Sequence, residues 1–258
     1  MKQPPPILRW IRALWRLFIL LATSFQACFA FLARRIRGPL TTAERSLWLH
    51  RSCRLALRRL RIETNSDGQF PLRGLLVSNH LSYLDILVFS SLAPCVFVSK
   101  KEVRSWPLYG WLARLGGTVF VDRKCSADAY RANLSMARAL SEGSVVVLFP
   151  EGTSSDGSAV LPFRTALLEA AVSSREPVCS AHISYAVEEG SVETEICYWG
   201  TMTFFPHLLR LMSLRGIRAQ VRFAAEAQRF EDRKIAALAT RELVLSLSNI
   251  PLASKASS

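Results

Sequence analysis

The sequence predicts an α/β fold with a mostly parallel central sheet flanked by helices. Short uncharged runs such as residues 74–77 and 145–149 have the length and composition of buried strands, and longer segments of helical character follow them. This alternation requires crossover connections, which are typical of parallel sheets. A chain of 258 residues with 50% hydrophobic content is long enough for one sizeable α/β core with an appendage.

The appendage is the N-terminal region, which is both basic and apolar. Residues 1–62 contain thirteen Lys and Arg against one acid, a balance of +12, whereas residues 63–258 contain twenty against nineteen, a balance of +1. Residues 17–33 are uncharged, and the arginines that flank them are Arg9, Arg12, Arg16, Arg34, Arg35 and Arg37. As a helix this run is about 25 Å long, against about 30 Å for a hydrocarbon core. It is therefore borderline as a single span, and a helix lying in one leaflet with arginines at the head groups fits at least as well.

A second, basic amphipathic helix is expected after Gly38 and Pro39, with Thr41 or Thr42 as its N-cap. Its basic stripe consists of Arg51, Arg54, Arg58 and Arg61, and the residues off this stripe are Cys53, Ala56, Leu57 and Leu60. A solvated face or a nucleic-acid arm would also be basic, but neither needs the adjacent apolar run. The predicted partner is an anionic membrane surface and not nucleic acid. Because arginines beyond the apolar run oppose translocation, we expect the protein at the cytoplasmic face of the inner or plasma membrane.

The six cysteines are scattered and include no C-x-x-C pair, so reduced thiols are expected, with no metal site and no disulfide framework. Residues 63–250 are expected to form the catalytic domain and residues 251–258 a disordered tail. The expected strands are 74–77, 96–99, 117–121, 145–149, 178–184, 193–199 and 217–223. The expected helices are 82–92 capped by Ser82, 106–115 opened by Pro107, 126–140 capped by Ser126, 163–174, 204–214 and 231–247.

His80 and Asp85 are the candidate catalytic pair. On one uninterrupted helix, side chains five residues apart point about 140° away from each other, so they meet only if His80 lies in the loop and Asp85 in the first helical turns. A histidine held by a carboxylate is fixed in one tautomer and stabilised as imidazolium, as a general base for a hydroxyl requires. On spacing alone, a helix-start histidine with a capping aspartate is the favoured interpretation, and the catalytic one depends on residues further along the chain.

Two further strand ends carry residues suited to anions. Arg123 follows the strand 117–121 at the carboxyl edge of the sheet, where its guanidinium could grip a phosphate or could form a surface ion pair. The turn-rich segment 150–157 follows the strand 145–149 and could present backbone N–H groups to an anion, or could be only a tight loop.

Together, the three segments resemble the glycerophospholipid acyltransferase family, whose best-known members are 1-acylglycerol-3-phosphate O-acyltransferases. The matching motifs are Asn79-His80-x4-Asp85, Gly117-x-x-Phe120-x-Asp122-Arg123 and Phe149-Pro150-Glu151-Gly152-Thr153, and the resemblance covers residues 72–223. It implies transfer of an acyl group from acyl-CoA or acyl carrier protein to the hydroxyl of a lysophospholipid, with no other cofactor.

The resemblance also implies roles for single residues. His80 is the expected base, Asp85 its orienting partner, and Arg123 the residue that holds the acceptor's phosphate. The other expected substrate-binding residues are Lys101, Glu151, Gly152, Thr153 and Arg164.

The residue at position 154 bears on which lysolipid is the acceptor. The motifs favour 1-acylglycerol-3-phosphate, which gives phosphatidic acid, but Ser154 stands where the family often has arginine. Another lysolipid, such as lyso-ornithine lipid, is therefore the alternative acceptor. A catalytically silent lipid-binding protein is a further alternative, opposed by the intact His80 and Asp85. The fourth motif is weak, with Ala181 at the usual proline position, and His182 is expected to be a satisfied core residue.

Overall fold

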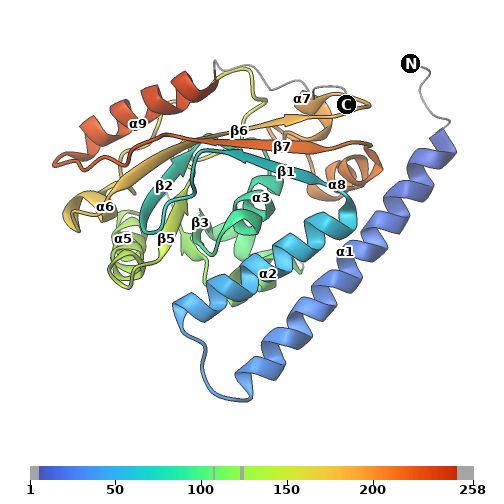
Figure 1. Cartoon of the computed structure of the whole chain (residues 1–258), viewed down its shortest axis with the longest axis horizontal. Helices are drawn as coiled ribbons and strands as arrows, with labels where there is room; N and C mark the ends of the chain where they lie inside the picture. The colour runs from blue at the N-terminus through green and yellow to red at the C-terminus, as the bar shows by residue number, and fades with distance from the viewer. Residues whose placement is uncertain (1–5, 107, 123–124, 249–258) are drawn as a thin grey trace.

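The computed structural model describes residues 6–106, 108–122 and 125–248, and it has the expected α/β architecture (Figure 1). The strands are β1 (Glu63–Asp67), β2 (Gly74–Ser78), β3 (Val96–Lys100), β4 (Val119–Val121), β5 (Val145–Leu148), β6 (Val178–Ala186) and β7 (Arg218–Phe223). The helices are α1 (Pro6–Arg35), α2 (Thr42–Leu60), α3 (Leu84–Leu92), the 3-10 helix η1 (Lys101–Ser105), α4 (Tyr109–Leu115), α5 (Ser126–Ser141), α6 (Glu169–Ser173), α7 (Val192–Glu195), α8 (Phe204–Ser213) and α9 (Arg233–Ser248).

Within the described residues the strands form one sheet in the order β1-β7-β6-β2-β5-β3-β4. Every neighbouring pair is parallel except β6 and β7, which confirms the mostly parallel sheet. β2 lies in the middle, between β6 and β5, and is fully buried. The loop that follows β2 therefore leaves the centre of the sheet at its carboxyl edge, the usual place for ligands in such folds.

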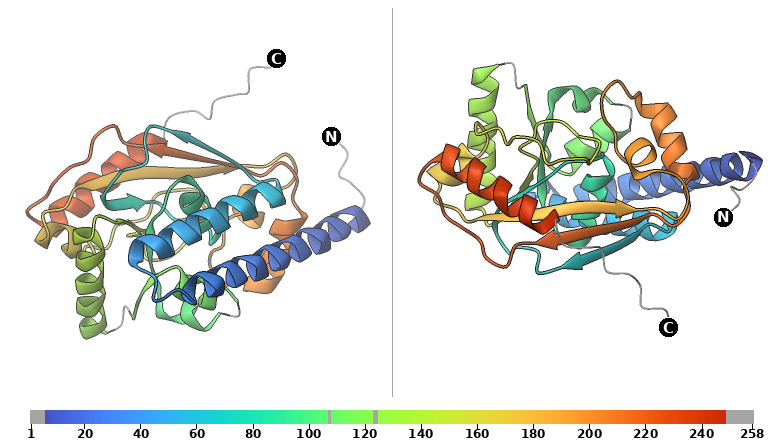
Figure 2. Two further views of the ribbon diagram at one scale, coloured as in Figure 1. Left: turned by 60° about the horizontal axis from the view of Figure 1, so that its bottom comes forward. Right: turned by 90° about the horizontal axis from the view of Figure 1, so that it is seen from above.

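Helices cover both faces of the sheet (Figure 2). One hydrophobic cluster joins α1, α2, α3 and α8 to one face, and a second joins α5, α6 and α9 to the other. The pleat of β2 divides its side chains between them, because Leu76 belongs to the first cluster and Leu75 and Val77 to the second.

Several expected boundaries are wrong. Residues 193–199 are not a strand but the end of α7 and an irregular segment, and α6 forms only the last part of the helix expected at 163–174. The N–H of Arg164 donates to the carbonyl of Pro150 at 2.8 Å, so the preceding residues pack as a loop against the turn after β5. β1 was not predicted, because an exposed edge strand lacks an apolar pattern.

The expected helix caps also need correction. Tyr83 is at the N-cap position of α3 and makes no side-chain hydrogen bond to the helix, and the hydroxyl of Ser82 has no hydrogen-bond partner among the described residues. Cys125, and not Ser126, is at the N-cap position of α5, also without a side-chain hydrogen bond to the helix. α4 begins at Tyr109, after η1, and Pro107 lies outside the described residues.

The expected N-terminal helices are present as a side-by-side pair, α1 and α2. Thr41 caps α2 in a capping box with Glu44, and the residues off its basic stripe, Cys53, Ala56, Leu57 and Leu60, are buried as expected. α1 has 30 residues, and residues 7–35 are long and apolar enough to cross a membrane by length and composition. The tail expected at 251–258 lies outside the described residues.

The arginines at the start of α1 contact the protein, contrary to the expected role at lipid head groups. Arg9 pairs with Glu195, and Arg12 lies 3.4 Å from Glu189. Arg16 donates to the carbonyl of Leu214. Since Ala13 and Leu20 of α1 also belong to the core cluster of the catalytic region, residue 62 marks a change in composition and not a boundary between two cores.

Candidate active site

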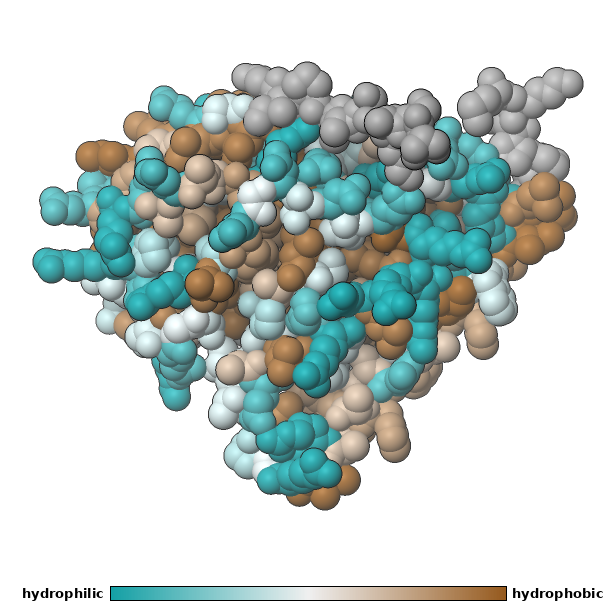
Figure 3. All heavy atoms as spheres, viewed as in Figure 1, coloured by the Kyte–Doolittle hydropathy of each residue, from teal (hydrophilic) through white to brown (hydrophobic). Residues whose placement is uncertain are grey.

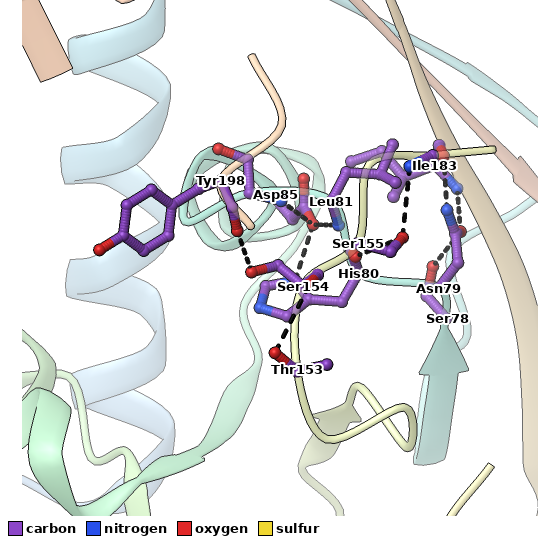
Figure 4. A network of polar contacts seen from close by, with 12 residues as sticks. Ser78, Asn79, His80, Leu81, Asp85, Thr153, Ser154, Ser155, Ile183 and Tyr198 are labelled. Atoms are coloured by element: carbon purple, nitrogen blue, oxygen red, sulfur yellow. Dashed lines mark hydrogen bonds and ion pairs between the residues drawn. The ribbon is translucent and has the colours of Figure 1, made fainter. Parts of the chain in front are cut away.

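His80 and Asp85 meet at the carboxyl edge of the sheet, as their spacing predicts (Figure 4). His80 lies in the loop after β2, and Asp85 is the second residue of α3. The distance from His80 Nδ1 to Asp85 Oδ2 is 2.8 Å. With Nδ1–H donating to the carboxylate, Nε2 carries the lone pair, and no partner for Nε2 occurs within the described part of the chain.

Asp85 is completely buried, and its carboxylate is held by further donors. The backbone N–H groups of Leu81 and Ser82 donate to Oδ2 at 2.7 and 3.0 Å, and the hydroxyl of Tyr185 donates to Oδ1 at 2.6 Å. These bonds offset the cost of removing a charged carboxylate from water. Tyr185 was not predicted, since the strand expected at 178–184 stops one residue before it.

The loop that carries His80 is fixed from two sides. The side-chain amide of Asn79 donates to the carbonyl of Ile183 at 2.9 Å and accepts from its N–H at 2.8 Å, so it continues the pairing between β2 and β6. The carbonyl of His80 accepts from the N–H of Ser155 at 2.9 Å. The ring of His80 stacks on Phe149, and its side chain keeps 20% of its surface exposed.

The turn after β5 brings the third motif beside His80. Gly152 has φ +77°, a backbone conformation that glycine adopts without strain, and its N–H donates to the carbonyl of Phe149. Thr153 is exposed, and the hydroxyl of Ser154 donates to the carbonyl of Tyr198 (Figure 4). The family often has an arginine at position 154. Here the position holds a serine whose hydroxyl is hydrogen-bonded to the backbone.

Glu151 points away from solvent and is only 3% exposed. Burial raises its pKa to about 8, and the nearby Asp85 adds to the shift, while the backbone N–H groups of His80 and Leu161 partly offset it. Neither carboxyl oxygen has a regular hydrogen bond to the described residues. Glu151 thus lies behind the His80 loop, and its expected role in substrate binding stays a prediction.

Lys101 and Arg164, two of the three expected cationic residues, have different surroundings in the structure. Lys101 Nζ lies 3.8 Å from Asp122 Oδ2, so this lysine is engaged by a carboxylate. Arg164 is exposed at the rim of a small cleft that β5 and its following turn share with α5. Arg123 lies outside the described residues. The phosphate-binding roles of all three stay predictions.

A partly open apolar space borders the loop that carries His80. It has a volume of about 120 Å³ and is lined by residues of α1, α2, α3, β3, η1 and α4. Tyr83, three residues after His80, forms part of its wall, together with Phe97 and Ala113. Its lining is almost wholly apolar, which suits a hydrocarbon chain.

His182 is separate from the candidate pair His80 and Asp85. Its pKa is lowered to about 4 by burial and by Arg222, so the ring is neutral at physiological pH. Its Nδ1 is buried without a partner among the described residues, so the expectation of a satisfied core histidine is wrong. Within that same part of the chain, no group of three His, Cys, Asp or Glu residues is placed to hold a metal ion.

Comparison with known proteins identifies the family. A family model described as Acyltransferase matches residues 61–184. The lyso-ornithine lipid O-acyltransferase of Rhizobium meliloti is 36% identical over 201 residues, which are 72% of this chain and 68% of that protein. This chain belongs to the acyltransferase family. A 1-acyl-sn-glycerol-3-phosphate acyltransferase of Neisseria meningitidis is 32% identical over 161 residues, 62% of this chain and 63% of the relative.

A solved structure supports the same fold. The 1-acyl-sn-glycerophosphate acyltransferase PlsC of Thermotoga maritima superposes with a TM-score of 0.64 at 20% identity, covering 94% of this chain and 100% of that chain. The family resemblance noted in the motifs is therefore confirmed. The relatives named here act on lyso-ornithine lipid and on 1-acyl-sn-glycerol-3-phosphate.

Proposed function

We propose that this acyltransferase moves a fatty acyl group from an acyl thioester to the hydroxyl of a lysolipid, with His80 as general base. The observation that carries the proposal is the 2.8 Å bond from His80 Nδ1 to the fully buried carboxylate of Asp85. That bond orients the ring and leaves Nε2 for the substrate.

The reaction needs no covalent enzyme intermediate. Nε2 of His80 removes the proton of the acceptor hydroxyl while the hydroxyl oxygen attacks the thioester carbonyl. The new carbon–oxygen bond forms, the carbon–sulfur bond breaks, and the departing thiolate takes the proton back from the imidazolium. Asp85 stabilises the imidazolium between these two transfers. General-base assistance of this kind supplies a rate factor of about 10² to 10⁴.

The acceptor that the site supports best is lyso-ornithine lipid. Its head group is an amino acid and carries no phosphate, so a base at position 154 is not required. Ser154 fills that position and donates to the carbonyl of Tyr198. Relatives from Rhizobium meliloti and Pseudomonas aeruginosa, each 36% identical to this chain, are named for that acceptor. 1-Acylglycerol-3-phosphate, which the motifs favour, is the second candidate, supported by the third-motif match and the relative from Neisseria meningitidis.

Acyl-CoA or acyl carrier protein is the proposed donor. The apolar space of about 120 Å³ starts beside Tyr83, close to the catalytic loop, and offers the acyl chain a route away from water. Each methylene that leaves water contributes about 0.8 kcal/mol, so such a space favours binding of a long chain. No resident cofactor takes part in the proposed reaction.

The N-terminal helices are proposed to hold the enzyme on the cytoplasmic face of a membrane. The outer face of α1 exposes large apolar side chains, among them Trp15, Phe18, Phe25 and Phe29. Figure 3 shows hydrophilic side chains along α2, the helix with the basic stripe, next to hydrophobic ones along α1. Because Arg9 and Arg12 tie α1 to the catalytic region, we place α1 along one leaflet with this face in the lipid. The arginines of α2 then meet anionic head groups.

A product assay tests the proposed function. The full-length enzyme on anionic liposomes is given lyso-ornithine lipid, 1-acylglycerol-3-phosphate or a larger lysophospholipid, each with acyl-CoA or acyl carrier protein as donor. Mass spectrometry of the products is expected to show acylated ornithine lipid first. His80→Ala is expected to stay folded and bound but to form no product. Near-normal transfer by this variant would refute the base assignment, and preference for 1-acylglycerol-3-phosphate would replace the leading acceptor by the second.

A further inference from the structure

Tyr185 supports the catalytic pair from the opposite side of the site. It lies near the end of β6, with 5% of its surface exposed, and its hydroxyl donates to Asp85 Oδ1 at 2.6 Å. Tyr185 is one hundred residues from Asp85 in the chain and belongs to none of the three motifs. The hydrogen bond between Tyr185 and Asp85 therefore forms only because the fold brings these two distant residues together.

The two oxygens of Asp85 have different partners. Oδ2 accepts from His80 Nδ1 and from the backbone N–H groups of Leu81 and Ser82. Among the described residues, Oδ1 accepts one hydrogen bond, the one from Tyr185. A carboxylate gripped at one oxygen can turn about its carbon–carbon bond, whereas a grip at both oxygens fixes its plane. The bond from Tyr185 therefore determines how Oδ2 faces the imidazole.

Strand β6 holds both ends of the catalytic loop. Ile183 pairs with the side-chain amide of Asn79 just before His80, and Tyr185 grips Asp85 just after it. Ile183 makes its contact through the backbone, and Tyr185, two residues further along the strand, makes its contact through the side chain. A single strand thus sets the distance between the part of the loop that carries the base and the part that carries its partner.

We propose that Tyr185 is a positioning residue, which orients the Asp85 carboxylate and thereby holds His80 in its reactive tautomer and direction. The proposal rests on the proposed role of His80 as the base. Burial and the adjacent Asp85 raise the pKa of the Tyr185 hydroxyl well above its usual value, so Tyr185 keeps its proton and stays a donor wherever the enzyme works.

Tyr185→Phe tests the proposal, because it removes the hydroxyl and keeps the ring. The variant is expected to fold with a melting temperature lowered by several degrees, because Oδ1 of the buried Asp85 loses its donor. Its kcat is expected to fall about 10- to 100-fold, the usual effect of losing a hydrogen bond to a charged group, with KM for both substrates unchanged. With the charge of Asp85 no longer shared with Tyr185, Asp85 holds the imidazolium more strongly. The acidic limb of the pH–rate profile is therefore expected to move to higher pH.

A double-mutant cycle separates this role from a merely structural one. If Tyr185 acts through Asp85, adding Tyr185→Phe to Asp85→Asn lowers kcat no further. Tyr130→Phe, on the exposed face of α5, is the matched control and is expected to keep full activity. Normal kcat and an unshifted pH profile in Tyr185→Phe would overturn the proposal, and so would additive losses in the double variant.

Two further measurements cover the remaining outcomes. If Tyr185→Phe does not fold, 3-fluorotyrosine at position 185 keeps the hydroxyl and strengthens its donation, and it is expected to move the acidic limb to lower pH. An unmoved limb would overturn the proposal. The downfield proton resonance of His80 Nδ1–H reports the same geometry without turnover. This resonance is expected to shift in Tyr185→Phe, and the shift can be measured even if the wild-type enzyme shows no acyl transfer in the product assay. An unchanged resonance would refute the positioning role of Tyr185 and would leave the proposed function untouched.

Discussion

The imidazole ring of His80 lies flat against the phenyl ring of Phe149, with centroids 4.2 Å apart and planes inclined by 12°. Phe149 directly follows β5 and is itself packed against Phe89 and Phe97. The bond to Asp85 fixes one atom of the imidazole, and the stack fixes its plane. The His80 ring is thus constrained by a polar contact from α3 and an apolar contact from the central sheet.

Phe149→Leu is expected to lower kcat by up to about tenfold, because a stacked ring pair contributes about 0.5–1.5 kcal/mol beyond its buried area. KM should change little, since the stack acts on the base and not on the lipid. Phe230→Leu, in the hydrophobic cluster on the other face of the sheet, is the control for lost aromatic packing. Equal activities of the two variants in the liposome assay would contradict a role for the stack.

Glu151 is expected to make folding stability fall as pH rises from acid to neutral. Its folded-state pKa of about 8 lies above the usual value near 4.5, so its stabilising effect is complete below about pH 4.5 and is lost progressively up to about pH 8. Between pH 6 and pH 9 this loss amounts to about 3 kcal/mol, nearly all of it below pH 8. Glu151→Gln keeps the shape of the neutral carboxyl and cannot ionise, so its melting temperature should fall less than that of the wild type over this range.

The same variant tests the expected substrate contact of Glu151. If the carboxyl serves as a neutral buried group, Glu151→Gln should keep kcat and KM near the wild-type values at pH 7. A large rise in KM for the acceptor would show instead that the charged carboxylate binds substrate. If the melting temperatures of the wild type and Glu151→Gln fell by the same amount between pH 6 and pH 9, the stability prediction would be contradicted.

The exposed face of α1 is expected to provide most of the membrane affinity. Phe25 and Phe29 are 70% and 75% exposed, so replacing both by serine removes lipid contacts without opening the core. Flotation with anionic liposomes should show binding weakened by at least about tenfold, from the apolar area lost. The control Ile235→Ser with Leu238→Ser alters two exposed residues of α9 and should bind like the wild type. Equal binding of the two double variants would contradict this orientation.

Charge at the membrane can be tested separately with the basic stripe of α2. Replacing Arg51, Arg54 and Arg58 by glutamine should weaken binding to anionic liposomes, by about 1 kcal/mol per arginine, and leave binding to neutral liposomes unchanged. These side chains are exposed, so the melting temperature should hold. Deleting the whole N-terminal region is a poorer test, because it removes Leu57 and Leu60 from the core. Equal losses on both kinds of liposome would contradict a charge effect.

The parts of the site that were predicted depend on short stretches of sequence. The strand–loop–helix pattern around His80 and Asp85 contains its own signals, an apolar run followed by polar residues, and the observed bond agrees with the geometry that five-residue spacing requires. The resemblance then added the turn at Glu151 and Gly152. Even the misplaced cap at Ser82 leaves this geometry intact, because the N–H of Ser82, and not its hydroxyl, binds Asp85.

The parts that were missed depend on contacts between distant segments. Tyr185 reaches Asp85 only through the register of β2 and β6, which local sequence does not specify. The pairing of Arg9 with Glu195 likewise needs the start of α1 to lie beside the end of α7, and no sequence pattern indicates that contact. Residues 193–199 read as a strand from their composition, but Ile196 and Cys197 are buried by packing beside α7 and not by a ladder.

The apolar space that borders the loop of His80 is expected to set the length of acyl chain that the enzyme accepts. Ala113 of α4 lines this space, so Ala113→Phe fills part of its 120 Å³. A filled space has no room for the end of a long chain, and shorter donors should then be used in preference. Ala127→Phe, at an exposed position of α5, controls for the added ring.

Competition between donors of different length gives the clearest measurement of this effect. With a mixture of acyl chains and one acceptor, the product masses report relative kcat/KM directly. In Ala113→Phe the ratio of short to long products should rise by about tenfold or more, because a few displaced methylenes at about 0.8 kcal/mol each exceed the 1.4 kcal/mol that corresponds to a factor of ten. An unchanged ratio, with full activity, would show that the acyl chain binds elsewhere. A uniform loss for all lengths would show that the added ring disturbs the catalytic loop through Tyr83 and does not shorten the space.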